Sequence, residues 1–232
     1  ILSEAVDPDP TIVLGRLVRE FDHMFLLGDP PDYEQPFDQS IRALAQRAGV
    51  TPEELVYDLM LERDGHNMLY VTLCNYEYGS LESSLAMMRH PGAVLGLGDG
   101  GAHCGTICDG SFPTFMLSYW VRDRTRGERL SLSETVRMLS RDAARAVGLE
   151  DRGVIAPGYK ADLNVIDLDQ LRLYAPEVAH DLPTGGRRLV QRADGYCATI
   201  VSGRIVHRNG SHTGELPGRL VRGPQAAPPN MH

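Results

Sequence analysis

The sequence has 232 residues, of which 42% are hydrophobic and 23% charged. A chain of this length and composition can bury a core in one or two domains, which excludes a wholly disordered protein. Its formal net charge of −8 excludes nucleic acid and anionic membranes as main partners, because both bind a basic surface.

The cysteines and the apolar runs indicate the compartment. The sequence contains no Cys-x-x-Cys pair, no signal peptide and no apolar stretch of membrane-spanning length. These features predict a reduced, cytoplasmic protein without a membrane partner. The chain begins at Ile1 inside an apparently structured region, so we expect an N-terminal half to be missing. The four cysteines are Cys74, Cys104, Cys108 and Cys197.

The first elements are short. Residues 4–40 are rich in Asp and Pro and contain two apolar runs, which predicts one or two strands with long connections. Residues 40–49 predict a helix with Ser40 as its N-cap and Gly49 just beyond its end.

Residues 51–54, Thr-Pro-Glu-Glu, form a strong helix start. Thr51 is expected to cap the helix, with proline in the first turn and Glu54 completing a capping box. The helix should run to about Asp64. Its expected buried side consists of Leu55, Val56, Leu59 and Met60.

The next segments alternate in type. Met68–Leu73 predicts a strand, Leu81–Arg89 a helix and Ala93–Leu97 a second strand. Helices and strands joined by short connections imply a parallel sheet covered by helices. The continuous apolar run at 93–97 suits a strand that is buried on both faces.

Two helices should follow the loop at 98–111. The first is expected from Pro113 to about Asp123, and the second begins at a capping-box pattern, Ser131-Leu132-Ser133-Glu134. The apolar stripe of the second helix is Leu132, Val136, Leu139, Ala143 and Val147.

After Gly148 the sequence becomes rich in turns and short strands. Residues 161–167 predict a strand, residues 198–202 and 204–207 a hairpin, and Asn209-Gly210 a further turn. We therefore predict three parts: an α/β part at 1–147, a small β domain at 148–216 and a tail at 217–232 with few anchors.

The most informative segment is Gly98-Asp99-Gly100-Gly101-Ala102-His103. An acid stands at the C-terminal end of an apolar strand, and glycines around it allow a sharp turn and close approach of a ligand. Active-site residues of α/β barrels lie at that end of the strands. Asp99 is therefore either a catalytic carboxylate or part of an ordinary Asp-Gly turn.

This segment resembles the strand-eight region of metal-dependent amidohydrolases related to the N-acyl-D-amino-acid deacylases. The resemblance continues, in the expected order, over most of the chain. It implies the C-terminal portion of a (β/α)8 TIM-like barrel followed by a small β-sandwich domain. The segments that carry it are 110–113, 140–145, 153–163, 180–188 and 214–223.

The resemblance also implies a reaction. In such enzymes Zn²⁺ lowers the pKa of bound water to roughly 7, and the resulting hydroxide attacks the amide carbonyl of a small-molecule substrate. Asp99 matches the strand-eight aspartate that deprotonates the water, ligates the metal and protonates the departing nitrogen. His103 is expected to contact substrate, shape the loop or ligate a second metal, unless it has no direct role.

Residues 75–78 follow a predicted strand and should face the mouth of the barrel. Asn75, Tyr76 and Tyr78 are therefore candidate substrate contacts, and the alternative for a tyrosine is packing under a loop. Three further features are interpreted as structural: Cys104 and Cys108 as small buried residues, the segment Lys160-Ala161-Asp162 as part of the β domain, and Arg187-Arg188 as a solvated or interface pair.

Much of the family's site is absent from this sequence. It has eight histidines but no His-x-His pair, and a barrel needs about 250 residues. The main zinc ligands should therefore lie upstream, and this chain alone should not bind zinc tightly. Its exposed apolar edge should pair with the missing N-terminal half or with a second copy. The loop at 105–109 lacks the arginine that in the family grips the substrate carboxylate.

Two other functions remain open. The chain could be a non-catalytic assembly or regulatory half of an amidohydrolase. It could also belong to a cyclic amidohydrolase of the hydantoinase or dihydroorotase kind, although the resemblance at 180–223 argues against this.

Overall fold

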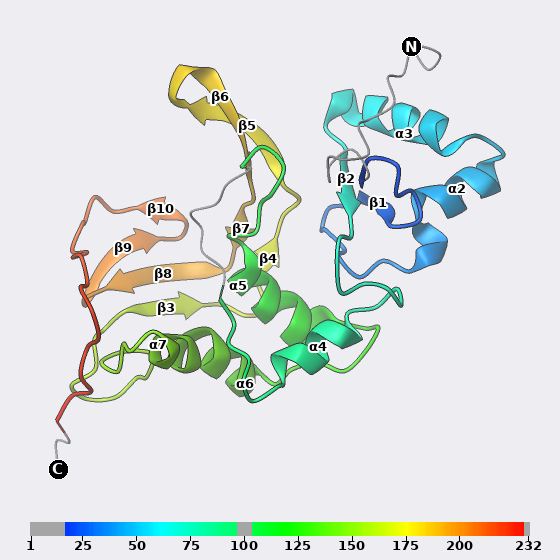
Figure 1. The fold of residues 1–232 in the computed structure, drawn as a ribbon. Coiled ribbons are helices and arrows are strands. Elements are labelled where there is room, and N and C mark those ends of the chain that lie inside the picture. The colour runs from blue at the N-terminus through cyan, green and yellow to red at the C-terminus, as the bar shows by residue number, and fades with distance from the viewer. Residues whose placement is uncertain (1–16, 97–103, 230–232) are drawn as a thin grey trace. The chain divides into compact units, whose positions relative to one another are not determined.

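The computed structural model describes residues 17–96 and 104–229, and these residues form two compact units that divide between Leu85 and Ala86. Figure 1 shows the elements of both units, which are described separately below. Helices and strands both occur, so the predicted α/β content is confirmed.

The first unit combines a two-stranded sheet with two helices. Its core consists of Phe21, Met24 and Ile41, against which side chains of the helices and strands pack. The elements are β1 (Met24–Leu27), η2 (Phe37–Gln39), α2 (Ile41–Ala48), α3 (Pro52–Leu61), η3 (Glu62–Gly65) and β2 (Met68–Val71), followed by α4 (Glu82–Met88) at the boundary.

The helix ends of the first unit confirm the predictions from capping residues. The Ser40 hydroxyl accepts the N–H of Ala43, and Gly49 adopts a left-handed conformation at the end of α2. Thr51 and Glu54 form the predicted reciprocal capping box. The helix α3 ends at Leu61 rather than near residue 64, and a 3₁₀ turn follows.

The buried side of α3 was predicted correctly except at one position. Leu55, Val56 and Leu59 pack on the core cluster, but the side chain of Met60 is 53% exposed. Each helical residue is rotated by about 100° from the one before it. Met60 therefore lies about 140° around the helix from Leu55, beyond the arc that Leu55, Leu59 and Val56 turn toward the core.

The helices of the second unit follow one another between residues 112 and 146. They are α5 (Phe112–Phe115), η4 (Met116–Asp123), α6 (Leu132–Arg137), η5 (Met138–Asp142) and α7 (Ala143–Ala146). The segments η4 and η5 are π-helical. Both helical regions that the sequence predicts are confirmed, and the Ser131 hydroxyl accepts the N–H of Glu134.

The apolar repeat of the second helical region is not the side of the helix that is buried. Leu132 and Val136 are each 46% exposed and Val147 is 68% exposed, whereas Thr135 and Met138 are buried. The buried residues Thr135 and Met138 each lie one position before a residue of the predicted stripe, and α6 packs against η4. The apolar periodicity predicts the helix correctly, but it does not tell on which side of the helix the neighbouring helix packs.

The β elements of the second unit are all antiparallel ladders. β3 (Leu163–Ile166), β8 (Tyr196–Val201), β9 (Arg204–Arg208) and β10 (Ser211–His212) form one sheet in the order β10-β9-β8-β3, drawn from yellow-green to orange in Figure 1. Two ribbons accompany it: β4 (Arg172–Leu173) with β7 (Ala193–Asp194), and β5 (Glu177–Leu182) with β6 (Gly186–Val190), where η6 (Pro183–Gly185) joins β5 to β6.

The two tight turns of the larger sheet confirm the hairpin prediction. Ser202 and Gly203 connect β8 to β9, and Asn209 and Gly210 connect β9 to β10. All four residues have positive φ, between 47° and 79°. Two successive residues of positive φ are the signature of the turn that matches the twist of a hairpin.

The prediction of a parallel sheet is wrong for the described residues. β1 pairs with β2 in antiparallel register, with Met24 opposite Val71 and Leu27 opposite Met68. Residues 93–96 form no strand, and Val94 is 52% exposed instead of buried on both faces. A parallel strand needs hydrogen-bonding neighbours from distant sequence, and the described residues place none beside 93–96. The barrel portion and the β-sandwich stay predictions.

The segment predicted to be a poorly anchored tail is tied to the helical region. The N–H of Gln225 donates to the carbonyl of Gly148 at 2.8 Å, and the Gln225 carbonyl accepts the N–H of Glu150 at 2.9 Å. Pro224 lies against Gly148. The prediction of few anchors is therefore wrong at Gln225. Across 17–96 and 104–229, no helix is both long and apolar enough to cross a bilayer.

Candidate functional site around the loop after residue 96

Asp99 and His103, the two candidate residues of the glycine-rich loop, lie outside the described residues. Their roles stay predictions. The described chain resumes at Cys104, so the surroundings of the loop can be built from its C-terminal flank, residues 104–115, and from the strands that this flank contacts.

Four contacts join this flank to residues 187–196. The N–H of Leu189 on β6 donates to the carbonyl of Cys104 at 2.7 Å. The side chain of Arg187 lies over Gly105, with its Nε 3.5 Å from the place where a β-carbon on that glycine would stand. Further along are a hydrogen bond from the Ser111 hydroxyl to Gln191 and one of 2.8 Å between the hydroxyls of Thr114 and Tyr196. The β5–β6 ribbon therefore contacts the chain at Cys104 and Gly105.

The charges beside this flank are arranged around Arg188. Its guanidinium donates two hydrogen bonds of 2.7 Å to the carboxylate of Asp181, which hold the pKa of Asp181 below its usual value and raise the pKa of Arg188. Burial raises the pKa of the Cys108 thiol, the nearby charge of Asp109 adds to this, and Arg188 opposes it. Cys108 is therefore a protonated thiol at neutral pH rather than a ready nucleophile.

The prediction that Cys104 and Cys108 are small buried residues is wrong for Cys104, which is exposed, while Cys108 is half-buried. Cys104 stands where the chain crosses the edge of β6, with its backbone carbonyl paired and its side chain in solvent. No sequence signal marks that crossing.

The loop after β2 presents its three candidate substrate residues differently. Asn75 is exposed, has a positive φ of 60°, and its carbonyl accepts a hydrogen bond from Ser83 at 2.8 Å. Tyr78 is 81% exposed. Tyr76 is only 2% exposed and takes the packing role that the sequence left open for a tyrosine. Substrate contact by Asn75 and Tyr78 stays a prediction.

Tyr76 belongs to an aromatic cluster. Its ring makes edge contacts with Phe25 and Phe37, with centroids 6.2 and 6.0 Å away, and its hydroxyl donates to the carbonyl of Gln35 at 2.5 Å. These contacts hold the middle of the loop to the core of the first unit. The flanking Asn75 and Tyr78 are thereby presented outward on a fixed base.

Glu34 is a buried acid to which the sequence assigned no role. Its side chain is fully buried, and its Oε1 accepts the N–H of Leu81 at 2.7 Å, just before α4 begins. A carboxylate is buried at such cost only when it is hydrogen-bonded. Glu34 thus fixes the far end of the loop that carries Tyr78. An acid in a segment rich in Asp and Pro gives no sequence signal of burial.

The segment Lys160-Ala161-Asp162 has the structural role that the sequence predicts. The Asp162 carboxylate lies 2.9 Å from Lys160 and 3.5 Å from Arg152, and it accepts the N–H of Ser202 at 2.8 Å. It therefore anchors the turn between β8 and β9.

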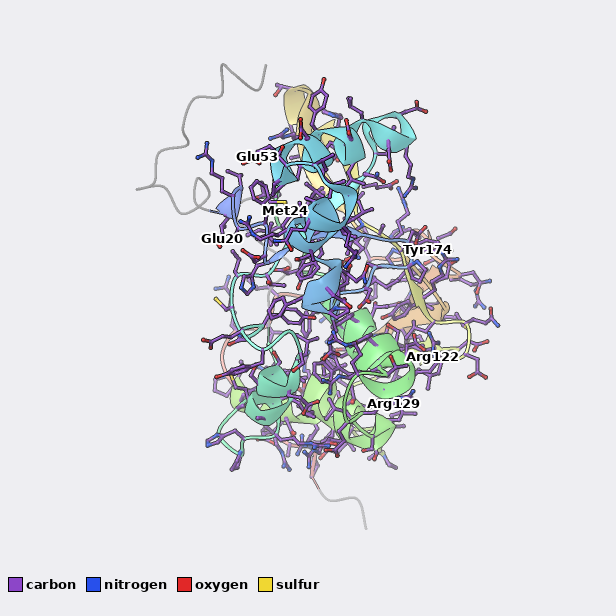
Figure 2. The ribbon with its side chains drawn as sticks, turned by 90° about the vertical axis from the view of Figure 1, so that its right-hand side faces the viewer. Glu20, Met24, Glu53, Arg122, Arg129 and Tyr174 are labelled. Atoms are coloured by element: carbon purple, nitrogen blue, oxygen red, sulfur yellow. The ribbon has the colours of Figure 1, made fainter. Side chains whose placement is uncertain are left out.

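Arg141, in the segment 140–145, also has a structural role. Arg141 donates to the carbonyls of Glu150 and Arg152, both at 3.3 Å. Gly153 packs on its backbone so closely that a β-carbon would stand 2.9 Å from the Arg141 Cα. Arg122 on η4, labelled in Figure 2, has a similar role. It donates to the carbonyls of Leu168 and Leu171.

A metal centre is not assembled by the residues that the structure describes. Nowhere in 17–96 or 104–229 do three side chains of His, Cys, Asp or Glu come together in a way that could hold a metal ion. A zinc site needs three or four such ligands, so the described residues by themselves do not fit one.

Comparison with known proteins identifies the family. Residues 25–207 match the model of the amidohydrolase family, and the chain therefore belongs to it. The chain is 35% identical to a 5-methylthioadenosine/S-adenosylhomocysteine deaminase of Desulfitobacterium hafniense over 101 residues, which are 43% of this chain and 23% of the relative. It is 42% identical to a dihydroorotase of Methanothermobacter thermautotrophicus over 86 residues, 35% of this chain and 19% of that protein.

Among solved structures, a D-aminoacylase is similar over 83% of this chain and 36% of its own length, with 20% identity and a TM-score of 0.43. The chain therefore spans less than a quarter of the curated relatives named here and about a third of this D-aminoacylase.

Proposed function

We propose that this chain is the C-terminal part of a metal-dependent amidohydrolase that removes the acyl group from N-acyl-D-amino acids. The observation that carries the proposal is the family match over residues 25–207, which encloses the Gly98-Asp99-Gly100-Gly101 segment. The substrate class is supported by the motifs at 110–113, 180–188 and 214–223, which resemble the deacylases.

The proposed task of Asp99 is proton transfer. Its carboxylate takes a proton from the attacking water and returns it to the amide nitrogen as the C–N bond breaks, so that a free carboxylic acid and a free amine are formed. A metal ion supplies activation of the water and polarisation of the carbonyl in such enzymes. A positioned acid–base group contributes roughly 10²–10⁴-fold in rate.

The remaining residues of the catalytic centre are proposed to come from a preceding part of the protein. This part would also cover the apolar side chains that the described helices expose, among them Leu132 and Val136. The proposed boundaries at residues 147 and 216 separate the barrel portion, the β domain and the C-terminal segment.

Hydrolysis of a cyclic amide is a second candidate, favoured by the 42% identity to a dihydroorotase over 86 residues. The bond broken is again an amide C–N bond, and Asp99 would perform the same proton transfer. The two candidates differ in the substrate, which is an N-acyl-D-amino acid for the first and a cyclic amide for the second.

A substrate panel on the full-length, metal-loaded protein distinguishes the candidates. It would compare N-acetyl-D-amino acids, their L-enantiomers, dihydroorotate and hydantoins by release of free amine or opening of the ring. Turnover of the N-acetyl-D-amino acids alone supports the proposal, and turnover of the cyclic amides alone selects the second candidate. A metal-loaded, folded protein that turns over none of them would indicate a non-catalytic assembly module.

A further inference from the structure

The helix α3 exposes apolar side chains on the side that faces away from the core of the first unit. Leu55 and Leu59 pack on the core cluster. Tyr57 and Leu61, which are about one helical turn apart, point away from it and are 45% and 60% exposed. A helix that is apolar on both sides is normally covered on both, so the outer side of α3 has the character of a docking surface.

Acidic side chains accompany this apolar pair, and their charges are not neutralised. Glu53, labelled in Figure 2, and Asp58 are exposed on α3, and Glu62 is its C-cap. Among the residues that the structure describes, no basic side chain forms an ion pair with any of these three acids. Residues 1–85 as a whole contain 16 acidic and 5 basic residues. A partner of this surface should therefore combine basic and apolar side chains.

A C-terminal segment of the second unit has this character. Residues 216–222 read Leu-Pro-Gly-Arg-Leu-Val-Arg. Leu216 and Leu220 are 84% and 75% exposed. Arg219 and Arg222 are exposed as well, and the described part of the chain offers neither of them an acidic partner. The segment therefore presents apolar side chains beside two uncompensated positive charges.

Contacts at both ends hold the segment 216–222. Before it, the Glu215 carboxylate lies 3.0 Å from the guanidinium of Arg204 on β9. After it, the Gln225 N–H donates to the Gly148 carbonyl at 2.8 Å. A segment anchored in this way loses less conformational freedom on binding than a free chain end would.

We propose that the outer side of α3 in one copy of the protein binds the segment 216–222 of a second copy. The apolar side chains form the centre of the contact, and the unpaired charges form its rim. Residues 86–232 contain 18 basic and 15 acidic residues, so their net charge is +3, against −11 for residues 1–85. These opposite charges favour contact between unlike units of two copies. When each copy gives its segment to the α3 of the other, two equal contacts close a twofold dimer. This dimer is independent of the reaction proposed above.

Sedimentation velocity of the purified full-length protein, over a wide range of concentration, tests this contact. The wild type should form a dimer whose dissociation constant rises with salt, because exposed ion pairs are screened. Asp58→Arg and Arg219→Glu should each raise the dissociation constant roughly 10- to 100-fold, since like charges then face each other. The two changes combined in one chain should recover most of the wild-type affinity, because the opposite charges are restored with their positions exchanged.

Glu77→Arg is the matched control, since it reverses an exposed acid of the same unit outside α3, and it should leave the dissociation constant unchanged. Circular dichroism checks that each variant is folded, and Glu53→Arg takes the place of Asp58→Arg if the latter unfolds. A protein that stays monomeric at every concentration would overturn the inference. So would a dimer that Asp58→Arg and Arg219→Glu do not weaken, or that both weaken without recovery in the double variant, because another surface would then form the contact. Equal weakening by Glu77→Arg would also overturn it, because overall charge and not this surface would then govern association.

Discussion

The sheet formed by β3, β8, β9 and β10 and the segment at residues 93–96 were both predicted as β structure, and only the sheet was found. In the sheet, β8, β9 and β10 pair in order and are joined by two-residue turns. Only β3, which pairs with β8, is far from its partner in the sequence. The segment 93–96 is equally apolar, but it forms no strand and Val94 is 52% exposed.

The difference shows what a strand needs besides an apolar sequence. The β8–β9 hairpin contains its own partner and its own turn, so local chemistry is sufficient to build it. A central parallel strand has to receive its hydrogen bonds from segments far away in the chain. A barrel strand at 93–96, as we propose, would have to find its partners elsewhere in the protein, whereas the sheet has its partners within the described residues.

The largest effect is expected at Asp99, which follows the proposed barrel strand in the sequence. Replacing Asp99 by Asn in the full-length protein should lower kcat roughly 10²–10⁴-fold, because the amide cannot accept or return the proton. The metal content should change little, because the main ligands are expected upstream of this chain, and the thermal unfolding midpoint should stay unchanged. Steady-state kinetics, elemental analysis and thermal unfolding measure these three quantities.

Asp109→Asn serves as the control, because Asp109 is an exposed acid on the same loop. It should retain activity. Activity that survives in Asp99→Asn would remove the catalytic assignment and leave only an Asp-Gly turn.

The β region of the second unit can be destabilised by substitution of a single glycine. Gly195 has φ of 97°, and a β-carbon there would stand 2.6 Å from the Cα of Leu171. Gly195→Ala should therefore lower the free energy of unfolding by about 2–5 kcal/mol, from backbone strain and overpacking together. Gly203→Ala also has positive φ, 79°, but nothing lies within 4 Å, so its cost should be about 1–2 kcal/mol.

Urea denaturation of the two variants provides the comparison. Equal losses would mean that strain alone matters and that Gly195 does not pack on Leu171 as described.

A smaller effect is expected in the helices of the first unit. Thr51→Ala removes the hydroxyl that accepts the N–H of Glu54 at 3.2 Å, and it should cost about 1 kcal/mol. Thr51→Ser keeps the hydroxyl and should restore most of the stability. Helicity by circular dichroism during urea denaturation measures both variants, and a Ser variant as unstable as Ala would argue against capping as the cause.

Sequence reasoning succeeded where a few adjacent residues determine the outcome. The caps at Ser40 and Thr51 and the turns at 202–203 and 209–210 are local hydrogen-bonding and φ preferences, and all were predicted. The face of α6 was missed, because its neighbour η4 is what decides which row is buried.

The candidate site likewise has one part that the sequence reveals and one part that it does not. The sequence marks Asp99 through its glycines, but it could not reveal that β6 contacts the chain at Cys104 and Gly105. The contacts of Leu189 with Cys104 and of Arg187 with Gly105 join residues more than 80 positions apart. No periodicity or spacing encodes such a contact, so Arg187 was interpreted only as one of a solvated or interface pair.

The smallest effect concerns the pH dependence of the sheet formed by β3, β8, β9 and β10. Burial alone would raise the pKa of Asp162, but the N–H of Ser202 and the charges of Lys160 and Arg152 together hold it below its ordinary value. A depressed folded-state pKa stabilises the protein above the unfolded pKa of about 3.9, and this contribution is lost as the pH falls through the lower folded pKa. Asp162→Asn should therefore flatten the loss of stability on the acid side.

The urea midpoint, followed from about pH 7 down to about pH 3, measures this slope. Lys160→Met should flatten it only in part, because the Ser202 N–H still holds the carboxylate at 2.8 Å. A slope that is unchanged in Asp162→Asn would mean that the anchoring of the β8–β9 turn does not depend on this charge. The turn geometry of Ser202 and Gly203 alone would then be sufficient to hold the sheet.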